Sequence, residues 1–85
     1  MRRYRLAPGH RLQWEEVQGR YVILYPEGLV ELNRSAAEIL KLCDGRSLEE
    51  IVAELERKFE TTGLREEIEE FLQAAVQHGW VRVEE

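Results

Sequence analysis

A tight hairpin constrains the fold of this 85-residue chain more than any other feature. The segment Arg20–Tyr25 is rich in β-branched and aromatic residues, which favour a strand. In the turn that follows, Pro26 presets its own φ and Gly28 can take the positive φ that closes a hairpin. We therefore predict that Leu29–Leu32 returns as a second strand beside the first.

The second strand leads into a helix almost without a loop. Asn33 is a suitable N-cap for a helix over Arg34–Cys43, and Asp44-Gly45 is a suitable stop. Leu29–Leu32 has one predicted partner strand and no obvious second. An edge strand of this kind can accept a strand from another chain.

The remaining residues predict two more helices and two short strands. Ser47 and Glu50 form a capping box at the start of a helix that ends near Phe59. A third helix, ended by Gly79, carries the apolar stripe Leu64, Ile68, Phe71, Leu72, Ala75 and Val76. Arg11–Trp14 is a plausible first strand and Trp80–Val83 could form a short final one. The predicted fold class is α+β and winged-helix-like: a small antiparallel three-stranded sheet followed by a three-helix bundle.

We expect one domain over residues 11–85, preceded by a flexible basic arm over residues 1–10. The arm holds three arginines and a Pro8-Gly9 break. Residues 1–34 carry six Arg and four Glu, whereas residues 35–85 carry six Lys or Arg and thirteen Asp or Glu, so the helical part is acidic. The chain has neither a membrane-spanning apolar run nor a signal peptide, which predicts a cytoplasmic protein with no membrane partner.

The charge pattern argues against nucleic acid as a partner. The start of the third predicted helix carries one cation, Arg65, and four carboxylates, Glu66, Glu67, Glu69 and Glu70. This excess of negative charge would repel a phosphate backbone. A winged-helix DNA-binding regulator using the N-terminal arginines is kept as an alternative.

No constellation for catalysis, metal binding or cofactor binding is found. His10, His78 and the single Cys43 share no metal-ligand spacing, and no Ser or Asp pattern suggests a triad. We expect no enzyme activity, no catalytic residue, no metal and no cofactor.

The two faces of the strand Arg20–Tyr25 raise a separate question, because both are apolar. The three helices can cover one face only, so the other needs the first strand and the arm, a second subunit or a partner protein. Exchange of a hairpin or arm between subunits would give a homodimer, and this alternative stays open.

The ordered set of motifs resembles the pyrroloquinoline quinone (PQQ) biosynthesis protein D family, PqqD. The motifs are RLAPGHRLQW at residues 5–14, LYPEG at 24–28, LN at 32–33 followed by SAAEIL at 35–40, CDG at 43–45, EIV at 50–52 and GW at 79–80. They extend over nearly the whole chain.

This resemblance implies a peptide chaperone without catalytic activity. It would bind the precursor peptide PqqA as an added strand, as a recognition element for a ribosomally made and modified peptide, and present it to the radical S-adenosylmethionine (SAM) enzyme PqqE. A PQQ-binding carrier is a second alternative. The implied peptide-binding residues are Leu29, Val30, Glu31, Leu32 and Asn33 on the edge strand, with Ile68, Phe71, Leu72 and Ala75 on the third helix. Which of these four helical residues line a groove and which fill the core is left open.

Overall fold

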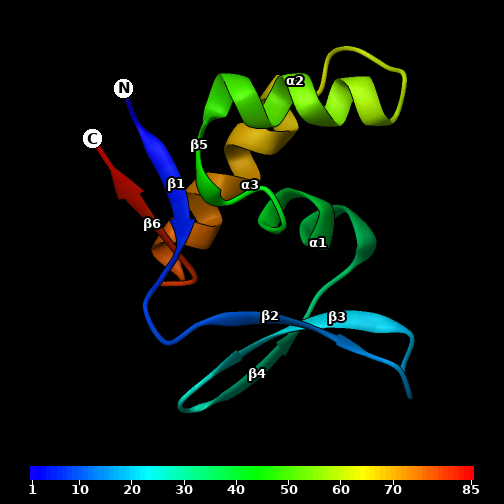
Figure 1. Cartoon of the computed structure of the whole chain (residues 1–85), viewed down its shortest axis with the longest axis vertical. Helices are drawn as coiled ribbons and strands as arrows, with labels where there is room; N and C mark the ends of the chain where they lie inside the picture. Colours follow the sequence, from blue (N-terminus) through cyan, green and yellow to red (C-terminus); the bar gives the residue numbers. More distant parts are fainter.

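The computed structural model describes all 85 residues as two three-stranded antiparallel sheets and three helices (Figure 1). The hairpin sheet has the order β2 (Arg11–Glu15), β3 (Arg20–Tyr25), β4 (Gly28–Glu31). The terminal sheet has the order β5 (Asp44–Ser47), β1 (Arg3–Leu6), β6 (Val81–Glu84). The helices are α1 (Arg34–Leu40), α2 (Leu48–Lys58) and α3 (Arg65–Gln77). The predicted α+β class, the predicted hairpin and the C-terminal strand are confirmed, whereas the terminal sheet was not expected.

The prediction of a flexible arm over residues 1–10 is wrong, because β1 is the middle strand of the terminal sheet. It pairs with β5 on one side and with β6 on the other. Tyr4 is buried in the main core, while Arg3 and Arg5 alternate with it on the solvent side. Arg3 lies 3.6 Å from a carboxylate oxygen of Glu50, and Arg5 donates to Glu84 at 2.8 Å. The basic residues are therefore the outer face of a strand.

The helix α1 ends three residues earlier than predicted. Its last turn tightens, since the N–H of Leu42 donates to Ile39 O and that of Cys43 to Leu40 O. The chain then extends directly into β5, which includes the positive-φ Gly45. Gly45 is favoured there by its backbone conformation, because its φ of +106° is one that residues with a Cβ rarely adopt. The guanidinium of Arg5 also lies against this position, and it is a flexible side chain that can move.

The core lies between the helices and the inner faces of the two sheets. Its most deeply buried side chains come from different elements and include Ile23, Leu40, Ile51 and Leu72. The predicted capping box is confirmed, because Glu50 N–H donates to Ser47 Oγ and Ser47 N–H donates to Glu50 Oε1. The box fixes the start of α2 directly after β5.

Polar side chains of the hairpin sheet cover part of its outer face. Val22 points to this face and is only 1% exposed. Its neighbours across the ladder are Gln13 on β2 and Glu31 on β4, which lie on the same face. Gln13 is held by Glu15, and Glu31 by Arg20. Side chains within the sheet therefore account for the burial of Val22, whereas Leu29 on the same face is 53% exposed.

Candidate functional site

β4 is an edge strand, as predicted, and its register determines which main-chain groups face outward. The N–H of Leu32 donates to Tyr21 O at 3.0 Å, so these two residues form a hydrogen-bonded pair. Hydrogen-bonded and non-hydrogen-bonded pairs alternate in an antiparallel ladder, so Val30 also bonds inward to its partner Ile23. The N–H and C=O groups of Leu29 and Glu31 consequently point away from β3, along the free edge.

The side chains of the predicted strand residues are divided between the two faces of the sheet. Val30 and Leu32 face the core, and Leu32 is nearly fully buried. Leu29 and Glu31 lie on the other face, where Leu29 is 53% exposed. Asn33 lies beyond the strand and accepts a hydrogen bond from Ala36 N at 2.8 Å as the N-cap of α1. Its side chain serves the helix and does not face the free edge.

The four predicted residues of α3 are mostly core residues. Ile68, Leu72 and Ala75 are at most 3% exposed, and only Phe71 is partly buried. The helix packs against α2 and β6, whereas β4 lies in the hairpin sheet at the bottom of Figure 1. None of the pockets is lined by residues of both β4 and α3. The structure therefore does not bring these four side chains together with the β4 edge.

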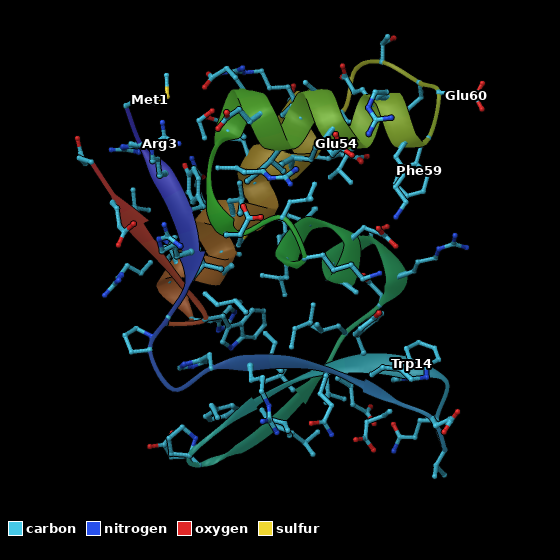
Figure 2. All side chains as sticks on the ribbon, in the orientation of Figure 1. Met1, Arg3, Trp14, Glu54, Phe59 and Glu60 are labelled. Atoms are coloured by element: carbon cyan, nitrogen blue, oxygen red, sulfur yellow. The ribbon has the colours of Figure 1, made fainter.

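A pocket that the sequence reasoning missed lies between the three helices, next to the start of α1. Its volume is about 430 Å³. Its apolar lining residues are Ile39, Leu55, Phe59, Leu64 and Ile68, and its polar ones are Arg34, Ser35, Glu38 and Glu67. Figure 2 shows Phe59 at the end of α2, on the side of that helix that faces α1. We call this cavity the helix pocket. Its residues come from three separate apolar stripes, so no local pattern indicates it.

A buried carboxylate forms one wall of the helix pocket. Glu38 is 9% exposed and accepts hydrogen bonds from Lys58 at 2.6 Å and from Lys41 at 3.4 Å. The hydrogen bond from Lys58 holds the pKa of Glu38 below its usual range, against the opposing effect of burial. Glu38 is therefore ionised at neutral pH and joins α1 to α2.

The thiol of Cys43 is shielded from reaction. Cys43 is buried, and desolvation raises the pKa of its thiol to about 12. His10 stacks on Tyr25, and His78 on Trp80. No group of three or more His, Cys, Asp or Glu side chains is arranged to hold a metal ion.

The charged surface gives little support to the DNA-binding alternative. The N-terminal arginines that it relied on face carboxylates: Arg2 lies 4.0 Å from Glu85, and Arg3 and Arg5 are paired as described above. The first turn of α3 carries Glu66 and Glu67. Phosphates would have to displace existing ion pairs on one surface and would be repelled by the other.

The family model described as coenzyme PQQ synthesis protein D (PqqD) matches residues 20–81, from β3 to the start of β6. The chain belongs to the PqqD family. It is 54% identical over 78 residues to a protein of Methylococcus capsulatus named PqqA binding protein, a match that covers 91% of this chain and 84% of the relative. A Klebsiella pneumoniae protein of the same name is 48% identical over 79 residues, covering 91% and 86%.

A solved PqqD structure has the same fold. The solution structure of the PqqD truncation of Methylobacterium extorquens PqqCD matches with a TM-score of 0.78 and 28% identity, and the match covers 93% of this chain and 87% of that one. That truncation is described as a functional, stand-alone recognition element for ribosomally synthesised and post-translationally modified peptides.

No helix of the present chain is long and apolar enough to cross a membrane.

Proposed function

We propose that this PqqD-family protein binds the precursor peptide PqqA by strand addition at the free edge of β4. The names of its relatives and the description of the Methylobacterium structure support the class of ligand. The observation that carries the place of binding is the outward direction of the main chain at Leu29 and Glu31, which follows from the hairpin register. The protein acts as a binding module and not as a catalyst.

The short length of β4 limits what main-chain pairing can contribute. Leu29 and Glu31 offer two donors and two acceptors along the edge. At about 0.5–1.5 kcal/mol for each hydrogen bond, four bonds contribute roughly 2–6 kcal/mol. Association costs at least about 4 kcal/mol in lost translational and rotational freedom. Strand addition therefore fixes the register of the peptide, and side-chain contacts have to supply much of the affinity.

Proline substitutions provide a direct test. Glu31→Pro removes an outward N–H and leaves the bonds between β3 and β4 intact, a change that an edge strand tolerates. Its matched control is Glu31→Gln, which also loses the ion pair with Arg20 but keeps the N–H. Titration with PqqA peptide should give weaker binding for Glu31→Pro by about tenfold and nearly unchanged binding for Glu31→Gln.

The strands β2, β5 and β6 also lie at sheet edges, so the test has to distinguish them from β4. In amide spectra of the labelled protein, addition of PqqA should shift the signals of Leu29 and Glu31 most strongly within the hairpin sheet. Equal affinity of the Glu31→Pro and Glu31→Gln variants, together with shifts centred on another edge, would place the peptide elsewhere.

We further propose that the complex presents PqqA to the radical SAM enzyme PqqE. An added strand leaves the ends of the peptide free, which fits delivery to a second protein. The modification of PqqA by PqqE should then be faster with this protein than without it, and the gain should be reduced by Glu31→Pro. An unchanged rate would limit the function to peptide binding.

A further inference from the structure

Two unexplained features meet at the helix pocket. The first is its apolar lining, with Phe59 43% exposed at the rim although it is a large aromatic side chain. The second is Arg34, which lies in the first turn of α1, is exposed and has no carboxylate within ion-pair distance. Most other arginines of the chain are paired.

The charges around the pocket are unevenly distributed. The charged residues that line the pocket are Arg34, Glu38 and Glu67, and of these Glu38 is already paired with Lys41 and Lys58. The chain as a whole carries a net charge of −5. The α3 side of the pocket presents the carboxylate of Glu67, which has no ion-pair partner either. On the α1 side of the pocket, Arg34 is therefore the charged group that is left free to pair with a ligand carboxylate.

The pocket is also close, along the chain, to the edge proposed for strand addition. Only Leu32 and Asn33 separate β4 from Arg34. A peptide paired with β4 that continues past Glu31 is therefore directed toward the start of α1. Main-chain hydrogen bonds at this short edge supply only part of the affinity, so a side-chain contact has to supply the rest. The pocket can hold one aromatic or large aliphatic side chain.

We propose that the helix pocket anchors a large apolar side chain of the bound peptide, with a neighbouring peptide carboxylate paired to Arg34. The occupant is the same peptide that adds to β4, so this inference rests on the proposed function. It assigns to Arg34, Phe59 and the base residues Ile39 and Ile68 a role in peptide selection.

The methyl signals of the four isoleucines of the chain can report where the peptide binds. Ile39 and Ile68 line the pocket, whereas Ile23 and Ile51 are fully buried elsewhere in the core. In methyl spectra of isoleucine-labelled full-length protein, added PqqA peptide should shift the signals of Ile39 and Ile68 and leave that of Ile51 nearly unchanged, whereas Ile23, which pairs with Val30 of β4, reports on strand addition.

Substitutions at the rim test the same point by affinity. Arg34→Glu should weaken PqqA binding about tenfold and Phe59→Ala about five- to tenfold. Ser35→Phe, which fills the pocket from its exposed rim, should weaken binding by a similar factor. Arg57→Ala and Val17→Ala are matched controls, because both residues are exposed and neither lines the pocket, and they should stay within about twofold of the parent.

The outcomes separate this inference from the proposed function. If Glu31→Pro weakens binding while the three rim variants behave like the controls, the anchor is wrong and strand addition stands. If the peptide does not bind the parent protein, both fail. Unchanged core methyl signals in each variant show that a loss of affinity is not a loss of fold.

Discussion

Removal of the Tyr4 side chain tests whether the N-terminal strand is structural. Tyr4 is 8% exposed, and its strand β1 is the only link between β5 and β6. Truncating a large buried aromatic residue typically costs about 3–5 kcal/mol. We expect about 3 kcal/mol for Tyr4→Ala, the lower end, because the strand lies at the margin of a small core. A domain of this size has a total free energy of unfolding of only roughly 4–13 kcal/mol.

The measurement is urea unfolding followed by tryptophan fluorescence, with thermal unfolding as a second readout. At about 4–8 °C per kcal/mol for a domain of this length, Tyr4→Ala should lower Tm by about 12–24 °C. Tyr4→Phe is the matched control and should change little, since the hydroxyl makes no hydrogen bond within the protein. Removal of Met1 and Arg2, which precede β1, should also be nearly neutral. A Tyr4→Ala variant within about 0.5 kcal/mol of the parent would refute the assignment of β1 and restore a flexible arm.

Two further predictions concern titratable groups in the core. The folded-state pKa of Glu38 lies below its usual value of 4.5, so the ionised group stabilises the fold above that pH and the stabilisation is lost as the pH falls below it. Glu38→Gln should therefore lower the free energy of unfolding by about 1–2 kcal/mol at pH 7 and by less at pH 3.5. A difference that does not depend on pH would contradict the ion pairs of Glu38 with Lys58 and Lys41. Cys43, with a thiol pKa of about 12, should react with a thiol reagent at pH 8 only as fast as the protein opens, and faster in Tyr4→Ala. Complete labelling of the native protein within seconds would show that the thiol is accessible.

The parts of the fold that local chemistry determines could be predicted from the sequence. Pro26 and Gly28 specify the hairpin turn, Ser47 and Glu50 specify the start of α2, and the structure contains both. The terminal sheet could not be predicted in the same way. Residue 3 pairs with residues 47 and 84, and each of the three strands has only four residues, too few for a clear period.

The same distinction between local sequence and tertiary packing applies to the candidate site. The edge position of β4 and the inward direction of Val30 and Leu32 follow from the alternation within one hairpin, and both are seen in the structure. The role of the α3 residues depends on tertiary packing. Their stripe is equally consistent with a core and with a groove, and only the arrangement of α3 against α2 and β6 assigns most of it to the core.

The connection between β4 and α1 determines how the two parts of the proposed site work together. Leu32 is held by its hydrogen bond to Tyr21 and by burial, and Asn33 is held as the cap of α1. The edge and Arg34 are therefore fixed relative to each other before any ligand binds. Because ordering flexible protein segments reduces affinity, a preorganised connection lets a short strand pairing and one anchored side chain add their contributions. Inserting a glycine between Asn33 and Arg34 would move the β4 edge and the pocket relative to each other. The insertion should thus weaken PqqA binding although it removes neither contact. An equally tight complex would show that the peptide uses the β4 edge alone.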